Sequence, residues 1–235
     1  MRRVVVAGGT GQTGRRVVDL LRRRGDTVRV LSRRPERARQ SLGDPIEIHE
    51  GDVRDVSSLR GLARDASLAI VATGTRSYYG ANGGAAVDAE GNRNLVEALS
   101  TVEHIVFLSA FGLDRKSIFL SAFSAALNGY FRWKAEAEMA FRQGAVPLTI
   151  VRPVELRNRA PRSPALLNQV EPLSLLRTVS RELVAEVLVH CCGHPEAMGK
   201  TFEVCEDPDA APLDQQLQSL DVESGRGLPA KTPLF

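Results

Sequence analysis

Residues 3–14 read Arg-Val-Val-Val-Ala-Gly-Gly-Thr-Gly-Gln-Thr-Gly, and this stretch decides the fold class. Val4 to Ala7 is an apolar run of the length of a buried strand, and Thr13 to Arg24 has the apolar spacing of an amphipathic helix. Gly8, Gly11 and Gly14, spaced three residues apart, directly follow the strand and open the helix. Because glycine lets the backbone turn tightly and approach a pyrophosphate closely, the stretch predicts a strand, a phosphate-binding loop and a helix.

This loop is predicted to hold the phosphates of a nucleotide. The start of the helix offers free backbone N–H groups and the positive end of the helix dipole. The predicted contacts are Gly8, Thr10, Gly11, Gln12, Thr13 and Gly14. The alternative is a glycine-rich turn in a domain that has lost its ligand, but the position between a strand and a helix favours nucleotide binding.

The rest of the chain alternates short apolar runs with amphipathic segments. The expected strands are 27–32, 46–49, 68–73, 105–109, 148–152 and 201–205, and the expected helices are 56–64, 86–99, 130–143 and 180–192. This alternation predicts an α/β Rossmann fold, a doubly wound, mostly parallel sheet of about seven strands with helices on both faces. We expect a single domain over 1–235, in which 154–235 form a small C-terminal substrate or lid portion, with an irregular tail from about Glu206.

Composition excludes several classes of protein. The chain has 235 residues, and its hydrophobic fraction of 43% is enough for a sizeable core. No apolar run approaches the roughly 20 residues that cross a bilayer, so no membrane span is expected. Three cysteines, two of them adjacent, indicate a reducing compartment rather than a disulfide framework. Since the chain enters a strand at once, no leader is expected, and the predicted location is the cytoplasm, or an organelle stroma if a transit peptide has been removed.

Residues 1–40 contain twelve arginines against three acidic residues. A nucleic-acid-binding protein could carry such a segment, but no aromatic side chains are interleaved here to stack on bases. The preferred interpretation is solvated helix faces with a few arginines for a cofactor phosphate, so no nucleic-acid partner is predicted.

Arg33 and Arg34 follow the second predicted strand, at the position that usually decides between NAD(H) and NADP(H). An NAD-binding domain usually carries Asp or Glu at this point, to hold the ribose hydroxyls. Guanidinium groups instead suit a 2′-phosphate, so the predicted cofactor is NADP(H), with Arg33 as the main contact. The alternative is that both arginines are solvated.

Further motifs cover nearly the whole chain. They are Gly51-Asp-Val53, Ala72-Thr-Gly-Thr75, Val87-Asp-Ala-Glu-Gly-Asn-Arg-Asn-Leu95, His104-Ile-Val-Phe-Leu-Ser109, Ile150-Val-Arg-Pro153 and Ser180-Arg-Glu-Leu-Val-Ala185. With the GGTGQTG loop, they resemble the atypical short-chain dehydrogenase/reductase family, in its short form with NmrA-like and biliverdin/flavin-reductase-like members. The resemblance implies that Asp52 accepts from the adenine amine. It also implies that the cofactor is lined by Val53, Ala72, Thr73 and Gly74 on its adenosine side and by Pro153 and Val154 at the nicotinamide.

Tyr130 and Lys134 are the candidate catalytic pair. Residues four apart share one face of a helix, and an ammonium beside a phenol lowers its pKa from about 10, so that Tyr130 could protonate a carbonyl as hydride arrives. The resemblance implies that Lys134 also holds the nicotinamide ribose and that Ser109 hydrogen-bonds the substrate carbonyl. The alternatives are a Tyr130 packed under a lid and an acceptor that needs no protein acid.

Asp88 departs from the family, whose ordinary members carry Asn there to support a proton relay. That relay is in doubt, and a structural role that ties the helix to a loop is equally expected. His190 and His194 have ligand-type side chains, but the helix is expected to end between them, so no metal site is predicted. The apolar segment 117–131 is interpreted as a lid over the nicotinamide, as core or subunit contact, or as a membrane-surface helix.

These features predict an NADPH-dependent reductase that transfers hydride to a small conjugated acceptor, such as a flavin, a quinone or a tetrapyrrole-like compound. The alternative is a non-catalytic NADP(H)-binding regulator or scaffold that senses the redox state of its cofactor. A homodimer or a protein partner is left open.

Overall fold

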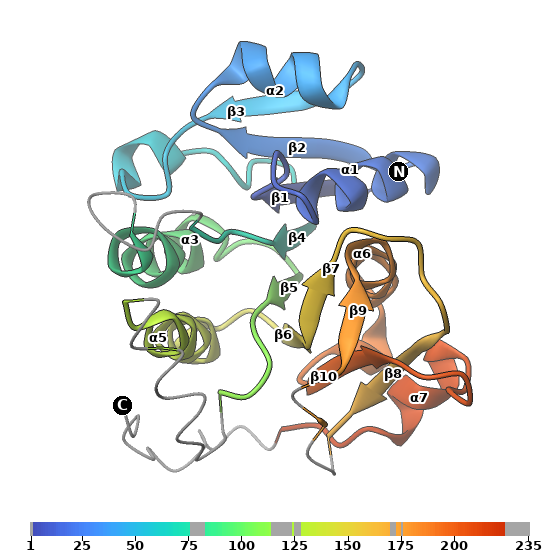
Figure 1. Cartoon of the computed structure of the whole chain (residues 1–235). Helices are drawn as coiled ribbons and strands as arrows, with labels where there is room; N and C mark the ends of the chain where they lie inside the picture. The colour runs from blue at the N-terminus through green and yellow to red at the C-terminus, as the bar shows by residue number, and fades with distance from the viewer. Residues whose placement is uncertain are drawn as a thin grey trace.

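The computed structural model describes residues 2–75, 83–113, 124, 128–169, 173–174 and 176–223. Its main sheet has the strand order β3-β2-β1-β4-β5-β6-β10-β8 (Figure 1). The strands are β1 Arg3–Ala7, β2 Thr27–Ser32, β3 Glu47–Glu50, β4 Leu68–Val71, β5 His104–Leu108, β6 Leu148–Pro153, β8 Ala165–Asn168 and β10 Thr201–Glu206. All neighbours pair in parallel except β8, which pairs antiparallel with β10. The predicted Rossmann-type sheet is confirmed, with eight strands rather than seven.

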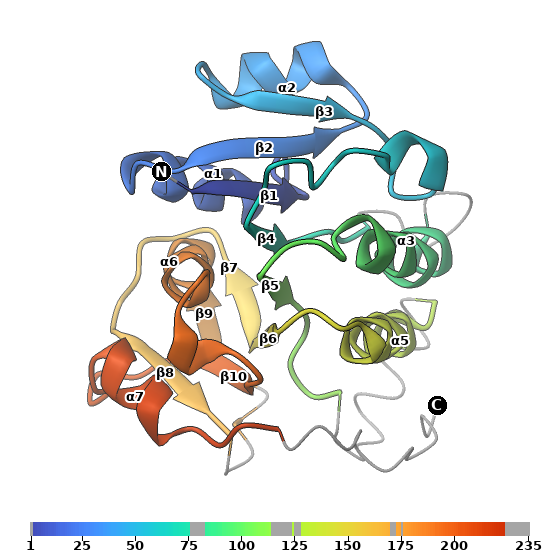
Figure 2. The ribbon, with the colours of Figure 1, turned by 180° about the vertical axis from the view of Figure 1, so that it is seen from behind.

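Helices cover both faces of this sheet. Helices α1 (Gly14–Arg23) and α6 (Arg181–Cys191) lie on one face, while α3 (Gly91–Ala98) and α5 (Tyr130–Gln143) lie on the other, as Figures 1 and 2 show from opposite sides. Alternate residues of β1 point to the two faces: Val4 and Val6 belong to the core under α1 and α6, and Val5 and Ala7 to the core under α3 and α5. The remaining helical segments are α2 (Pro35–Leu42), α7 (Leu213–Ser219), 3-10 turns at Val56–Leu59 and Pro195–Ala197, and a π-helix at Ala85–Glu90 that leads into α3.

The C-terminal third differs most from the expectation. Two short strands, β7 (Glu155–Arg157) and β9 (Thr178–Ser180), form a separate parallel ribbon. The irregular tail predicted from Glu206 is wrong at α7, because Leu217 is fully buried and the side chain of Gln216 bonds the backbone of β8, accepting from Leu167 N at 2.8 Å. The predicted helix 56–64 is also wrong beyond its first turn, the 3-10 segment. Within the described ranges, no helix is both long and apolar enough to cross a membrane.

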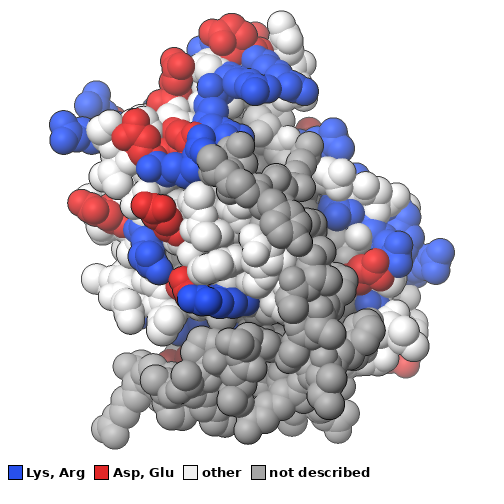
Figure 3. Space-filling view, turned by 60° about the vertical axis from the view of Figure 1, so that its left-hand side comes forward, with Lys and Arg blue, Asp and Glu red and all other residues white. Residues whose placement is uncertain are grey.

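Seven of the twelve arginines in the first 40 residues lie within 4.0 Å of a carboxylate of the described residues. Arg23 lies 2.8 Å from Asp19, and Arg29 lies 2.9 Å from Glu47. Figure 3 shows acidic side chains interspersed among the basic ones in the upper part of the molecule. This mixture of signs agrees with solvated helix and strand surfaces rather than a continuous basic surface.

His104 on β5 makes the stability of the fold depend on pH. It is fully buried, with Nε2 2.9 Å from Thr149 Oγ1, and its Nδ1 accepts from the backbone N–H of Gly193 at 3.2 Å. Burial lowers the pKa of His104 from 6.5 to about 4. The unfolded chain therefore takes up a proton at a higher pH than the folded one. We expect the free energy of unfolding to fall by about 3 kcal/mol as the pH drops from 7 to 4 because of this residue.

Urea unfolding of wild type and His104→Gln at pH 7, 5.5 and 4.5 measures this effect. Gln keeps a donor for Thr149 but does not titrate, so the comparison concerns the slope with pH and not the absolute stability. Equal slopes in the two proteins would contradict the prediction.

Candidate cofactor and active site

The phosphate loop joins the carboxyl end of β1 to α1, and its backbone requires glycine at two positions. Gly8 has φ +86°, and a Cβ there would overlap the carbonyl oxygen of Ala72. A Cβ on Gly14 would overlap the carbonyl oxygen of Gly8. Thr13 gives α1 no side-chain cap. In α1 itself, however, the backbone N–H of Arg15 donates to Gly11 O and that of Arg16 to Thr13 O, both at 3.0 Å. The backbone N–H groups available to a phosphate therefore precede Arg15.

Asp52, the predicted adenine contact, lies after β3 among arginines. Arg54 Nε lies 3.0 Å from its Oδ1 and 3.1 Å from its Oδ2, and Arg33 Nη1 lies 3.8 Å from Oδ2. The Arg54 guanidinium holds the pKa of Asp52 below its usual value. The side chain of Arg33 stays 59% exposed, and Arg34 is exposed too. Sequence reasoning missed Arg54, although it directly follows the Gly-Asp-Val motif.

Lys134 on α5 has a buried ammonium beside the loop that follows β4. Its Nζ lies 2.9 Å from Oδ1 of Asp88 and donates to the carbonyl oxygen of Thr73 at 3.1 Å. The Oδ2 of Asp88 accepts from the backbone N–H of Thr75 at 3.1 Å. The two side chains of the pair are only 5% and 1% exposed. Asp88 therefore ties the π-helix to the loop and to Lys134, as in the structural one of the two roles that the sequence left open.

This pairing changes what Lys134 can do for Tyr130. Burial favours the neutral amine of Lys134, but the Asp88 carboxylate outweighs it and raises the pKa of Lys134 above its usual value. Lys134 is therefore charged at neutral pH, yet the adjacent carboxylate offsets part of its field. Tyr130 is half-buried at the start of α5, with its ring 5.3 Å from that of Phe131. The ammonium thus lowers the pKa of a neighbouring phenol less than an unpaired one would.

A second buried ion pair fixes α5 against β6. Arg152 donates to both carboxylate oxygens of Glu138, from Nε at 2.9 Å and from Nη2 at 2.7 Å, and Arg142 Nη1 donates to Oε2 at 2.7 Å. Burial raises the pKa of Glu138, but the Arg152 charge outweighs it and lowers that pKa overall. Ser109 is buried close to the Glu138 carboxylate. Among the described residues, its Oγ has no partner that meets the geometry of a hydrogen bond. The network was missed from the sequence.

A family model described as NAD(P)H-binding matches residues 8–195. The chain belongs to this NAD(P)H-binding family. A relative from Arabidopsis thaliana, the uncharacterized chloroplastic protein At2g34460, is 33% identical over 224 residues, which cover 89% of this chain and 78% of the relative.

Solved structures of low sequence identity share the fold of this NAD(P)H-binding protein. ChuY from Escherichia coli O157:H7, described as an anaerobillin reductase, has a TM-score of 0.70 at 18% identity, covering 89% of this chain and 99% of its own. A short-chain dehydrogenase/reductase from Veillonella parvula in complex with NADP has a TM-score of 0.71 at 17% identity, covering 89% and 96%. The family model thus confirms the NAD(P)H-binding part of the predicted resemblance, and the solved structures confirm the fold that the resemblance implies.

The residues predicted for the cofactor in this NAD(P)H-binding protein gather at the carboxyl ends of the parallel strands. Pro153 ends β6, and Val154 is buried next to it with its N–H donating to Val204 O at 3.0 Å. Thr73 donates to Asn92 Oδ1 at 2.8 Å, so the loop after β4 is fastened to α3. Most of the predicted lid segment 117–131 lies outside the described residues.

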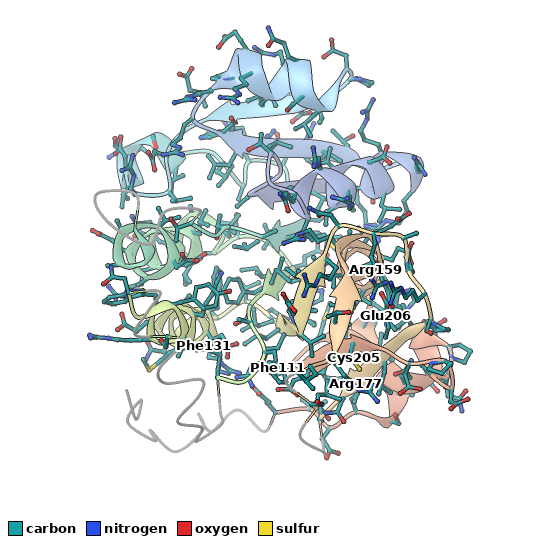
Figure 4. The ribbon with its side chains drawn as sticks, in the orientation of Figure 1. Phe111, Phe131, Arg159, Arg177, Cys205 and Glu206 are labelled. Atoms are coloured by element: carbon teal, nitrogen blue, oxygen red, sulfur yellow. The ribbon has the colours of Figure 1, made fainter. Side chains whose placement is uncertain are left out.

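Figure 4 labels six side chains between α5 and the C-terminal portion, of which Phe111, Phe131 and Cys205 are buried. It shows Phe131 beside α5, Arg159, Arg177, Cys205 and Glu206 beside β9 and β10, and Phe111 between the two groups. Arg159 lies 2.9 Å from Glu206, and Arg177 lies 3.1 Å from Asp207. The arginines of this group are therefore held by carboxylates of the C-terminal portion.

His190, His194 and Asp214 meet where α6 ends and α7 begins. The two Nε2 atoms lie 2.9 and 3.2 Å from Asp214 Oδ1, and all three could offer a metal ligand. However, His194 Nδ1 accepts from the backbone N–H of Glu196 at 3.2 Å, which places the proton of the neutral ring on Nε2. A metal would need the lone pair of that nitrogen. The hydrogen bond of His194 and the 2.9 Å contact of His190 with Asp214 account for the cluster without a metal. The absence of a metal site stays a prediction.

Proposed function

We propose that this protein is an NADPH-dependent reductase that transfers hydride to a small conjugated acceptor. The observation that carries the proposal is the buried Lys134 ammonium, held by Asp88 and Thr73 at the carboxyl edge of the sheet, next to the phosphate loop. A cation fixed there suits the hydroxyls of the nicotinamide ribose. The NADP complex of the Veillonella parvula structure and the reductase activity named for ChuY support the proposal.

The Asp88–Lys134 pair favours an acceptor that needs no protein acid. A paired ammonium lowers the pKa of Tyr130 less than a free one, so protonation by this phenol is disfavoured. Flavins, quinones and tetrapyrrole-like compounds accept hydride into a conjugated system, and solvent can complete their protonation. We therefore propose that Lys134 binds the cofactor and that Tyr130 has only a minor role in the reaction. The competing mechanism is one in which Tyr130 donates the proton to the acceptor.

NADPH consumption across a panel of flavins, quinones and aldehydes tests this function. With the best acceptor, we expect Tyr130→Phe to lower kcat less than threefold and Lys134→Met to lower kcat/KM at least 100-fold. Arg132→Gln, on the exposed face of the same helix, is the matched control. A loss of 100-fold or more in Tyr130→Phe would establish the Tyr acid instead. Tight NADPH binding without turnover on any acceptor would favour the alternative, a non-catalytic NADP(H)-binding regulator. The observation that supports this alternative is Asp88, which stands where ordinary members of the resembled family carry the Asn of the proton relay.

We also propose that Arg33 selects NADP(H) over NAD(H). Its exposed guanidinium lies at the end of β2, where the adenosine ribose is expected, and a charge-assisted bond to a 2′-phosphate contributes about 2 kcal/mol. Arg33→Asp should therefore weaken NADPH binding about 30-fold and NADH binding less than threefold. Titration of the intrinsic fluorescence with both nucleotides measures the ratio, and equal losses would refute the assignment.

A further inference from the structure

The N-termini of α1 and α6 lie close together at the phosphate loop. The two helices begin at the carboxyl edge of the sheet, and they also end side by side, because Arg24 Nη1, just after α1, donates to the carbonyl oxygen of Val189 in the last turn of α6 at 2.6 Å. Each N-terminus carries the positive end of a helix dipole. At α6 this positive end is partly offset, because Ser180 Oγ accepts from the N–H of Leu183 and Glu182 lies in the first turn. The case for an anion therefore depends on the side chains that reach this place.

Two guanidinium groups reach the same place from these helices. Arg16 on α1 folds back, so that its Nη1 donates to the carbonyl oxygen of Gln12 in the loop at 2.5 Å. Arg181, the first residue of α6, donates from Nη1 to Leu156 O and to Asn158 Oδ1, both at 3.1 Å. The amide of Asn158 in turn donates to Gln12 Oε1 at 3.3 Å. Gln12 is therefore linked to both arginines.

Neither arginine has an acidic partner in the part of the chain that the structure describes. Their neighbours Arg157 and Arg159 differ, since each forms an ion pair with a glutamate, at 2.7 and 2.9 Å. A cation in the first position of a helix is also disfavoured by the dipole. Burial and the nearby charge of Arg16 lower the pKa of Arg181. This concentration of positive charge is unfavourable in the protein alone, and a bound anion would relieve it.

We propose that Arg16 and Arg181 bind the diphosphate of NADP(H) from the side of the β7–β9 ribbon, facing the backbone N–H groups of the phosphate loop. The inference rests on the cofactor of the proposed function. The diphosphate is favoured over the 2′-phosphate because Gln12 belongs to the loop, whereas Arg33 lies at the end of β2. It is favoured over an anionic group of the acceptor because the acceptor is expected farther along, at Pro153 and Val154.

Calorimetric titration of the full chain with NADP⁺ and with adenosine 2′-phosphate tests the proposal, because the second ligand lacks the diphosphate. We expect Arg16→Gln and Arg181→Gln each to weaken NADP⁺ binding about 10-fold and to change adenosine 2′-phosphate binding less than twofold. Arg33→Gln should weaken both ligands. Arg157→Gln, on the same ribbon and paired with Glu155, is the matched control and should change neither.

Three outcomes would overturn the inference. The first is unchanged NADP⁺ affinity in both variants. The second is an equal loss for the two ligands, which would indicate a long-range field rather than contact with the diphosphate. The third is a higher KM for an anionic acceptor with unchanged NADP⁺ affinity, which would assign the pair to the acceptor. Failure of the reductase proposal is separate, since wild-type protein would then bind NADP⁺ without turnover, and a wild type that does not bind NADP⁺ would overturn both.

Discussion

Gly14→Ala is expected to weaken NADP(H) binding at least 100-fold and to lower the free energy of unfolding by about 3 kcal/mol. The added methyl group would overlap the carbonyl oxygen of Gly8, and Gly8 C and Gly9 Cα lie within 2.9 Å of its position. All of these are backbone atoms of the loop, so no flexible side chain can move aside. Relief requires the start of α1 to shift away from β1, which displaces the N–H groups intended for the phosphate.

Gly11→Ala provides the graded control. A Cβ on Gly11 would meet only the carbonyl oxygen of Gly8, at 3.1 Å, so a shift of a few tenths of an ångström accommodates it. We expect a stability loss of about 1 kcal/mol and a smaller loss of NADP(H) affinity than in Gly14→Ala. Urea unfolding and calorimetric titration measure both quantities, and a Gly14→Ala protein that binds and unfolds like wild type would show that the loop geometry is wrong.

Local sequence patterns were sufficient for the part of the fold that repeats strand, loop and helix. Val4 to Ala7 is apolar at every position because both faces of β1 are covered. Gly14 is required by steric contacts within the loop, and Gly8 by contacts with Ala72 and Thr73 after β4, the neighbouring strand of the sheet. Strand β8 and helix α7 could not be predicted in this way. Each is short, and each is stabilised by contacts such as those of Gln216 with β8, which no local periodicity reveals.

The candidate site shows the same division. The positions of Tyr130 and Lys134 on one helix follow from their spacing, and Lys134 is indeed buried at the carboxyl edge. The partners of the charged groups do not follow from spacing. Asp88 reaches Lys134 through the π-helix, and Glu138 reaches Arg152 across the interface between α5 and β6. A buried charge must find a counter-charge, so the sequence indicates that partners exist but not which they are.

Breaking the Asp88–Lys134 pair is expected to have the largest effect on stability. Lys134→Met leaves the Asp88 carboxylate buried without its cation, and Asp88→Asn leaves the ammonium without its anion. Removing one partner of a buried pair costs about 3–5 kcal/mol, whereas replacing both by uncharged groups costs much less. Asp88→Asn/Lys134→Met should therefore be more stable than Lys134→Met alone by about 2 kcal/mol or more. Urea unfolding of wild type, the two single variants and the double variant at pH 7.5 measures this double-mutant cycle. If the stability loss of the double variant equalled the sum of the two single losses, a direct interaction between the pair would be contradicted.

The pH dependence gives the pair a second, independent signature. In wild type the pKa of Lys134 is raised, so its stabilising contribution is complete below the pKa of an unfolded lysine, about 10.4, and is lost as the pH rises through the folded value. In Asp88→Asn, burial acts without the opposing carboxylate and lowers the pKa of Lys134 in the folded protein. Between this lowered pKa and the unfolded value of about 10.4, the unfolded chain binds more protons, so the free energy of unfolding should rise with pH. A variant whose alkaline slope keeps the wild-type sign would show that Asp88 does not set the charge of Lys134. The effect of this lysine on Tyr130 would then have to be assigned to other groups.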